Sequence, residues 1–264
     1  MTEQAHVGAP VLEAENLSIQ FGGLKALQEL SFSIPEKTVF SIIGPNGAGK
    51  TTFFNIVTGI YRPTAGDIRL YGESIVGLEP SRIVERGVCR TFQNIRLFQN
   101  LTVLENVMIG RQLHERTGLG DILLRTQRFR AQEAETLDRA AEILDYVGIL
   151  DDANALAKNL PYGRQRRLEI ARALATAPRL LLLDEPTAGM NPSESEEMVQ
   201  LFQRICEERG VCVLMIEHDM KVVMGVSQRI LVLNFGRQIA LGSPREVLEN
   251  EEVITAYLGH QKVM

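Results

Sequence analysis

The feature that most constrains the fold is the stretch GPNGAGKT at residues 44–51, which fits the phosphate-loop pattern G-x-x-x-x-G-K-[ST]. The apolar run TVFSIIG leads into it, and KTTFFNIVTGI, which has helical character, follows it. Glycines let the backbone turn its N–H groups inward around phosphate oxygens. Lys50 can reach the β- and γ-phosphates of a nucleotide, and the hydroxyl of Thr51 can ligate Mg²⁺. This order of strand, glycine loop and helix predicts a phosphate site, and an incidental glycine turn is the minor alternative.

A phosphate loop needs further groups to hydrolyse a nucleotide, and LLLLDE at residues 180–185 supplies two of them. Asp184 can hold Mg²⁺ directly or through water, and Glu185 can activate an attacking water as a general base. The alternative is an ordinary capping pair after a buried strand. His218, in EHD, closes the next apolar run. Because the ends of adjacent parallel strands form the ligand crevice of an open α/β sheet, we expect His218 to contact the γ-phosphate. The alternative is a histidine that is satisfied on the surface or in the core.

Apolar periodicity predicts an α/β protein. Residues 11–21 and 30–35 alternate like antiparallel strands. Apolar runs at 179–186 and 211–219 flank a helix at 193–209, which is typical of buried parallel strands joined by crossover helices. The other assignments are a loose tail at 1–10, strands at 38–44, 66–72 and 87–93, a hairpin at 229–244 and closing helices at 244–259.

The segment between residues 101 and 148 has a helical pattern. Within it, residues 131–148 place Ala134, Leu137, Ala141 and Leu144 on one apolar face, with charged residues opposite.

A second anion site is predicted at NLPYGRQRRLEIARAL, residues 159–174. A Pro-x-Gly break there runs into a helix that begins with Arg164, Arg166 and Arg167. The free N–H groups and the positive dipole end of such a helix attract an anion. The alternative for the three arginines is a solvated helix face.

Composition narrows the class of protein. Ordinary hydrophobic content, 45%, fits a globular chain of 264 residues, and the net charge of −5 argues against general nucleic-acid binding. Three cysteines without metal-ligand spacing indicate a reducing compartment. The N-terminus does not read as a signal peptide, and the apolar runs are too short to span a bilayer. If the chain works at a membrane, another chain spans it.

Over nearly all of its length the chain resembles the ATP-binding subunits of ABC transporters. The resemblance implies ATP and Mg²⁺ as cofactors. It also implies that Phe21 stacks on adenine, although a plain core Phe is the alternative. The implied Walker A residues that bind the nucleotide are Gly44, Pro45, Asn46, Gly47, Ala48, Gly49, Lys50, Thr51 and Thr52.

The same resemblance assigns the remaining catalytic residues. Gln93, in RTFQ, resembles the Q-loop glutamine, which ligates Mg²⁺ and water and senses the γ-phosphate. His218 resembles the switch histidine, and Glu185 the general base. The implied metal ligands are therefore Thr51, Gln93 and Asp184.

The family also explains the second anion site. Two ATPase domains pack head to tail in this family, and the signature helix of one faces the γ-phosphate held by the other. LPYGR takes the place of the LSGGQ signature, so Tyr162, Gly163 and Arg164 are expected to meet a partner's ATP. Pro161 stands where the family has serine, Arg164 where it has glutamine, and Asn191 replaces the D-loop aspartate. Proline offers neither a hydroxyl nor an N–H, which weakens this composite site.

The expected fold is a phosphate-loop ATPase core with a mainly parallel sheet and flanking helices. An antiparallel β subdomain and an α-helical subdomain at about residues 94–177 complete a single domain over residues 11–260. The helical insertion is implied by the family.

Further stretches narrow the resemblance to the LivG-type subunits of branched-chain amino acid importers. They are FGGLKAL, RTFQNIRLF, YGRQRRLEIARAL, TGLGDILLRTQRFR, IEHDMKVVMGVSQRI and VITAYLG. This implies a peripheral protein on the cytoplasmic face of the inner membrane. Its implied partners are a second ATPase subunit, two permeases and, indirectly, a periplasmic binding protein. The ATPases would act as an ATP-driven clamp, and residues 94–111 would contact a permease.

Other functions stay open at this point. Urea or amide importers and the lipopolysaccharide exporter share much of the pattern. A soluble ABC ATPase acting on nucleic acid or ribosomes usually has two ATPase domains or a long coiled coil, and this chain has one phosphate loop and no heptad array. In a phosphate-loop kinase, the signature stretch and His218 would have no role.

Overall fold

The computed structural model describes residues 10–112 and 126–258. The expected tail therefore lies almost entirely outside the described residues, as does most of TGLGDILLRTQRFR. The chain divides into two compact units. The first combines Met1–Val88 with Arg179–Met264, and the second is Cys89–Pro178.

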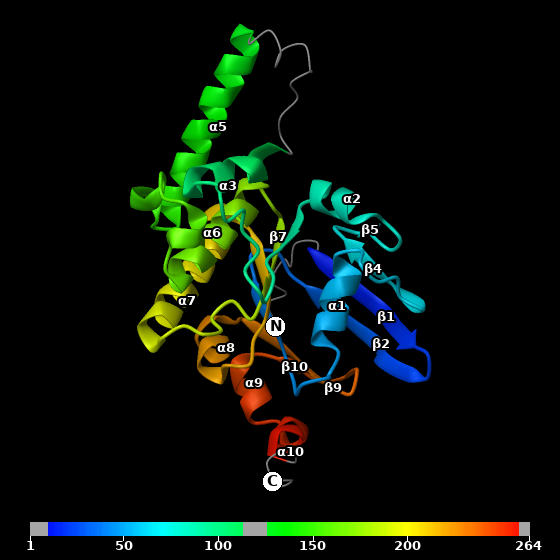
Figure 1. Ribbon diagram of the computed structural model, residues 1–264. Helices are drawn as coiled ribbons and strands as arrows, with labels where there is room; N and C mark the ends of the chain where they lie inside the picture. The colour runs from blue at the N-terminus through cyan, green and yellow to red at the C-terminus, as the bar shows by residue number, and fades with distance from the viewer. Residues whose placement is uncertain (1–9, 113–125, 259–264) are drawn as a thin grey trace, which may run out of the picture. The chain divides into compact units, whose positions relative to one another are not determined.

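A mainly parallel sheet has the strand order β10-β9-β3-β8-β7-β6, and Figure 1 labels its strands β7, β9 and β10. The strands β10, β9, β3, β8 and β7 belong to the first unit, whereas β6 begins at Val88 and continues into the segment assigned to the second unit. Strand β3 pairs in parallel with both β8 and β9, and β7 pairs in parallel with β8, whereas β10 is antiparallel to β9. All residues of β3, β7 and β8 are buried, which explains their continuous apolar runs. The strands are β3 (Val39–Ile43), β6 (Val88–Arg90), β7 (Leu180–Asp184), β8 (Cys212–Ile216), β9 (Arg229–Asn234) and β10 (Arg237–Gly242).

A second sheet of the first unit is antiparallel, with the order β2-β1-β4-β5. Its strands are β1 (Leu12–Phe21), β2 (Leu24–Ile34), β4 (Ala65–Leu70) and β5 (Glu73–Ser74). Strand β2 begins six residues earlier than the predicted start at residue 30. The turn is tight, because Gly22 has φ 56° and Phe21 already pairs with Leu24. Positive φ at Glu29 and register shifts along β1 interrupt the alternation, which hid the first half of β2 from the sequence pattern.

Helices of the first unit begin at recognisable caps. Asn191 and Glu194 form a capping box at the start of α7, and Gly210 ends that helix in the left-handed conformation. Ser243 and Glu246 form the same box before α9. The helices are α1 (Lys50–Val57), α2 (Pro80–Glu85), α7 (Pro192–Arg209), α8 (Met220–Val226), α9 (Pro244–Leu248) and α10 (Glu251–Leu258).

The second unit is helical. It contains α3 (Val103–Arg111), α5 (Gln127–Tyr146) and α6 (Tyr162–Ala175), with short 3₁₀ turns η2 (Leu150–Asp152) and η3 (Ala157–Asn159). Each of the three helices packs against the other two. Gly110 allows α3 to approach α6 closely, because a Cβ there would lie 2.4 Å from the carbonyl oxygen of Arg172.

The predicted apolar face of α5 is wrong in its N-terminal half. Ala134 and Leu137 are exposed, and Leu137 keeps 44% of its surface accessible. The buried positions are Thr136, Ala140, Ile143, Leu144 and Val147, and of these only Leu144 was predicted. The helices that pack against α5 determine which of its positions are buried, and a polar residue such as Thr136 can lie on the side of α5 that faces them.

No helix among the described residues is both long and apolar enough to cross a membrane. The α/β class, the parallel sheet and the antiparallel sheet agree with the predicted fold.

Candidate functional site

The phosphate loop follows β3 directly and takes conformations that require glycine. Gly44, Gly47 and Gly49 have φ angles of 148°, 81° and 105°. A Cβ on Gly44 would lie 2.0 Å from the carbonyl oxygen of Leu233, and one on Gly49 would lie 2.6 Å from that of Ala26. At Gly44 and Gly49, both the positive φ and the close neighbours therefore exclude a residue with a side chain. The loop is held in the shape in which its N–H groups can line an anion site.

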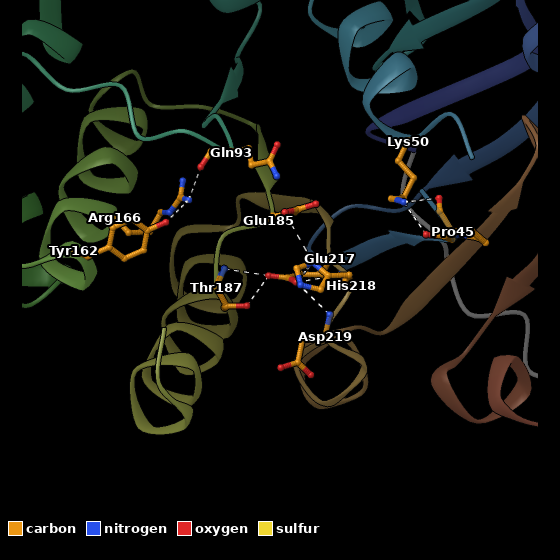
Figure 2. A network of polar contacts seen from close by, with 11 residues as sticks. Pro45, Lys50, Gln93, Tyr162, Arg166, Glu185, Thr187, Glu217, His218 and Asp219 are labelled. Atoms are coloured by element: carbon orange, nitrogen blue, oxygen red, sulfur yellow. Dashed lines mark hydrogen bonds and ion pairs between the residues drawn. The ribbon is translucent and has the colours of Figure 1, made fainter. Parts of the chain in front are cut away.

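Lys50 begins α1 and folds back over the loop. Its Nζ donates to the carbonyl oxygens of Gly44 at 2.6 Å and Pro45 at 3.0 Å (Figure 2). Burial lowers the pKa of Lys50, and the charges of Glu185 and Asp184 oppose that change. The charges of the two carboxylates therefore act on the ammonium group of Lys50.

The two carboxylates occupy different surroundings at the end of β7. Asp184 is the last residue of the strand and is buried. Glu185 follows with φ 48°, and its N–H donates to the carbonyl oxygen of Ile216 at 2.9 Å. A non-glycine residue at positive φ is costly and is often found at functional sites. The turn directs Glu185 away from the strand, and its side chain is 25% exposed.

His218 lies close to Glu185 at the end of the next strand. Its Nδ1 is 3.9 Å from Oε2 of Glu185 and 3.9 Å from Oε2 of Glu217. The imidazole is 65% exposed, so it is not a packed core histidine. The adjacency of His218 and Glu185 follows from the parallel pairing of β7 and β8, where Asp184 lies opposite Ile216.

Sequence reasoning missed Glu217. This carboxylate is buried and accepts hydrogen bonds from the N–H and hydroxyl of Thr187, at 3.0 and 2.6 Å (Figure 2). Its other oxygen accepts from the N–H groups of His218 and Asp219, at 3.0 and 3.4 Å. Glu217 therefore joins the turn after β7 to the turn after β8. Its position directly after the apolar β8 was the available signal, because a carboxylate there must find partners.

A cavity of about 670 Å³ joins the phosphate loop to Phe21 and Glu185. This volume is in the range of ligand pockets, roughly 300–1,000 Å³. Phe21 is 43% exposed and packs edge-on against Tyr61 with ring centroids 5.1 Å apart. Phe235, which was not predicted, also lines the cavity. The lining residues are Phe21, Gly23, Leu24, Lys25, Ala26, Gln28, Asn46, Gly47, Ala48, Gly49, Lys50, Thr51, Thr52, Glu185, Ile216 and Phe235.

The donor set in this unit fits a hard cation. Thr51 offers a hydroxyl in the first turn of α1 and lines the cavity, while Asp184 offers a carboxylate at the end of β7. Hydroxyl and carboxylate oxygens are ligands that Mg²⁺ accepts, and it keeps water for the remaining positions. Gln93, the third metal ligand expected from the sequence, belongs to the second unit.

In the second unit, α6 begins at the predicted signature stretch. Pro161 is the N-cap and supplies no side-chain hydrogen bond to the helix. The N–H of Gln165 donates to the carbonyl of Pro161, so the N–H groups of Tyr162, Gly163 and Arg164 precede the first helical hydrogen bond. Arg164 forms an ion pair with Asp152.

The solvated-face alternative is wrong for Arg166. Its side chain is fully buried and donates to the carbonyl oxygen of Phe92 at 2.7 Å. It also donates to the carbonyl oxygen of Gln93 at 2.9 Å (Figure 2). It also pairs at 2.8 Å with Glu169, which is buried and accepts from the N–H groups of Phe92 and Arg96. Arg166 therefore holds backbone around Gln93. The sequence showed only three arginines within four residues, and helical geometry turns one of them inward.

Asn191 has a local structural role. Its Oδ1 accepts from the N–H of Glu194 at 3.0 Å and its own N–H donates back to the Glu194 carboxylate. An aspartate can make the same cap, so capping alone does not explain the departure from the family pattern.

Two family models match this chain. One describes ABC transporters and matches residues 27–188, and the other describes branched-chain amino acid ATP-binding cassette transporters and matches residues 237–263. The chain is 48% identical over 250 residues to the high-affinity branched-chain amino acid transport ATP-binding protein LivG of Salmonella typhimurium. That alignment covers 95% of this chain and 98% of the relative.

Solved structures agree with these matches. The ADP conformation of MJ1267, an ATP-binding cassette of an ABC transporter, is 30% identical with a TM-score of 0.83, covering 96% of this chain and 100% of that one. A dimeric, post-hydrolysis state of the cassette MJ0796 bound to ADP and phosphate is 28% identical with a TM-score of 0.74, covering 89% and 99%. The chain therefore belongs to the ABC transporter family and, within it, to the LivG group of ATP-binding proteins.

Proposed function

We propose that this chain binds and hydrolyses ATP to power the uptake of branched-chain or similar amino acids by an ABC importer. The observation that carries the ATPase assignment is the cavity that brings Phe21, the phosphate loop and Glu185 together. An aromatic ring, a phosphate cradle and a carboxylate in one cavity suit the base, the phosphates and the attacking water of a nucleotide. The similarity to LivG supports the solute class.

Phosphate binding is assigned to the loop and Lys50. The loop N–H groups would surround phosphate oxygens, and the Lys50 ammonium would exchange its contacts with Gly44 and Pro45 for the β- and γ-phosphates. Thr51, Asp184 and Gln93 would hold Mg²⁺. When bound, the ion would neutralise charge that develops on the phosphates.

Hydrolysis is assigned to Glu185 with support from His218. Glu185 would accept a proton from the attacking water, which requires a carboxylate that reaches the cavity. His218 would contact the γ-phosphate from the neighbouring strand end. The buried Glu217 holds the backbone of both turns, so the two functional side chains need no hydrogen bond to each other.

The second anion site is assigned to a partner's ATP. Tyr162, Gly163 and Arg164 present N–H groups at the start of α6, where the positive dipole end favours a γ-phosphate. A related cassette is dimeric, which supports pairing with a second ATPase subunit, and the head-to-tail arrangement of that pair is part of the proposal. Residues 94–111 would contact a permease on the cytoplasmic face of the inner membrane. A periplasmic binding protein would deliver the amino acid, so the solute never touches this chain.

The ATPase assignment is tested with Glu185→Gln, which keeps the shape of the side chain and removes the base. We expect ATP to bind while single-turnover hydrolysis falls about 10²-fold, the usual size of a lost general base. Hydrolysis is measured in the reconstituted complex with the partner's site disabled. Glu207→Gln, on the exposed side of α7, is the control. A loss of less than about threefold, far below that size, would reassign the base.

The solute is tested by uptake in a strain that lacks this chain. We expect high-affinity uptake of radiolabelled leucine, isoleucine or valine to stop, and re-expression to restore it. Urea and short amides are measured in parallel. Loss of urea uptake alone would contradict the amino acid assignment and leave the ABC importer assignment standing.

A further inference from the structure

Phe235 is an exposed aromatic residue that neither local conformation nor core packing explains. It lies with Gly236 in the two-residue turn between β9 and β10, where Arg237 pairs with Asn234. Phe235 and Gly236 have φ angles of 45° and 76°, as a type I′ hairpin turn requires at both central residues. Asparagine, aspartate and glycine are favoured at the first of these positions, whereas a bulky aromatic residue is strained there. Phe235 is also 70% exposed, so it does not belong to the core.

The turn that carries Phe235 is fixed between β2 and the phosphate loop. The N–H of Gly236 donates to the carbonyl oxygen of Ala48 at 3.0 Å, and the carbonyl oxygen of Gly236 accepts from the N–H of Gln28 at 2.8 Å. The carbonyl oxygen of Phe235 accepts from Nε2 of Gln28 at 2.9 Å. A Cβ on Gly236 would lie 2.6 Å from the carbonyl oxygen of Ala26, so the turn packs closely on β2. Backbone contacts therefore hold the turn in place, and the ring of Phe235 takes no part in them.

Phe235 lines the same cavity as Phe21, Leu24 and the phosphate loop. Phe21 and Leu24 flank the turn between β1 and β2, and they are 43% and 69% exposed. Two hairpin turns therefore present large, exposed apolar side chains to one cavity. A nucleotide carries a flat aromatic base as well as charged phosphates. The base can cover this apolar surface while the loop holds the phosphates.

We propose that Phe235 is a second base-binding residue of the nucleotide site, whose ring packs against the base of ATP in addition to the ring of Phe21. The inference rests on the proposed ATP binding, and it concerns a residue that lies between the two segments matched by the family models. Strained backbone conformations cluster at ligand sites, which agrees with an aromatic residue kept at positive φ beside the cavity. The ring has no polar atom, so it binds the base and leaves the phosphates to the loop.

The test is Phe235→Ala in the full-length chain. Alanine keeps the Cβ, the positive φ and the backbone hydrogen bonds of the turn, and it removes only the ring. We expect the Kd for magnesium ATP, measured by titration calorimetry, to rise about tenfold, within the range for the loss of one base–aromatic stack. The Kd for magnesium tripolyphosphate, which has the phosphates and no base, should stay at the wild-type value. Phe235→Tyr keeps an aromatic ring and should bind ATP like wild type.

The matched control is Leu248→Ala, which removes another large, exposed apolar side chain at the end of α9 in the same unit. Its Kd for ATP should equal that of wild type. An unchanged Kd for ATP in Phe235→Ala, or an equal rise in Leu248→Ala, would overturn the inference. Equal weakening of ATP and tripolyphosphate by Phe235→Ala would overturn it too, because the defect would then lie in the phosphate loop.

The proposed function has a separate point of failure. Absence of ATP binding by the wild-type chain would refute the proposed function, whereas tight wild-type binding that ignores the Phe235 ring would refute only the inference. Loss of transport by Phe235→Ala with an unchanged Kd for ATP would also overturn the inference and assign the exposed ring to contact with a protein partner.

Discussion

At the scale of single residues, Glu217 decides how the catalytic turns are held. It is buried and accepts four hydrogen bonds, two from Thr187 and one each from His218 and Asp219. A carboxylate can accept at both oxygens, and no other side chain of that size offers the same capacity. The residue therefore supports the backbone of the two turns that carry Glu185 and His218, the side chains proposed to take part in hydrolysis.

Glu217→Gln should therefore destabilise the protein although it is nearly isosteric. One amide NH₂ would face N–H donors that now meet an oxygen, and such an unsatisfied buried group costs about 1–3 kcal/mol. Urea unfolding monitored by circular dichroism measures the change. The exposed Glu207→Gln serves as the control, and equal midpoints for the two variants would contradict the role assigned to Glu217.

The cysteines yield a prediction about reactivity. Burial raises the pKa of Cys206 to about 11 and that of Cys212 to about 12, and burial also raises the pKa of Cys89. The thiolate is the reactive form of cysteine, and a rise of two units in the pKa lowers the thiolate fraction at pH 8 about 100-fold. We expect slow reaction with an aromatic disulfide reagent in the folded state, faster reaction as pH rises towards 11, and three reactive thiols in denaturant. A thiol that reacts within seconds in the folded protein would contradict this.

At the scale of elements, α6 shows what sequence patterns reveal and what they miss. The start of α6 after Pro161 could be predicted from the sequence, because a Pro-x-Gly break before a periodic run marks the beginning of a helix. The inward turn of Arg166 was not, because whether an arginine finds buried partners depends on a segment more than seventy residues away. The prediction for the apolar face of α5 was wrong for the same reason. The neighbouring helices determine which positions are buried, so that Thr136 is buried and Leu137 is exposed. Local motifs at strand ends were predictable, and tertiary partners were not.

Arg166→Met should be strongly destabilising. It would leave Glu169 buried without its partner and release the carbonyls of Phe92 and Gln93. Breaking a buried pair on one side costs about 3–5 kcal/mol. Removing both charges with Arg166→Met and Glu169→Leu should recover part of that loss, as measured by a double-mutant cycle in urea.

The control pair for this cycle is Arg139–Glu142, which has the same i,i+3 spacing on an exposed helix surface. Arg139→Met should change the unfolding midpoint little, because water and salt screen exposed pairs. Similar losses at the two sites would show that the burial of Arg166 does not govern its contribution.

At the scale of the whole molecule, the two elements that we propose to bind anions belong to separate units. The phosphate loop belongs to the first unit, and the N-terminus of α6 belongs to the second. The first has Lys50, two carboxylates and an aromatic around one cavity, whereas the second has free N–H groups and Arg164, which is engaged with Asp152. The proposed base Glu185 and the proposed metal ligands Thr51 and Asp184 lie in the first unit, whereas Gln93, the third proposed metal ligand, belongs to the second. The second is suited to recognise a phosphate that another molecule holds, and this division of roles can be tested with one substitution.

Gly163→Asp adds bulk and a negative charge where the start of α6 would meet a partner's γ-phosphate. Like charges at that range in a closed site repel by several kcal/mol, on the order of the Coulomb energy at reduced dielectric. The phosphate loop of the same chain is unchanged. We therefore expect the isolated variant to bind a fluorescent ATP analogue like wild type, while ATP-driven closure and transport by the complex are lost. Gly225→Asp, in α8 with open space around the added Cβ, is the control for charge on a helix. If isolated Gly163→Asp loses nucleotide binding and Gly225→Asp does not, both anion sites serve the same ATP, and the head-to-tail pairing proposed for this chain is wrong.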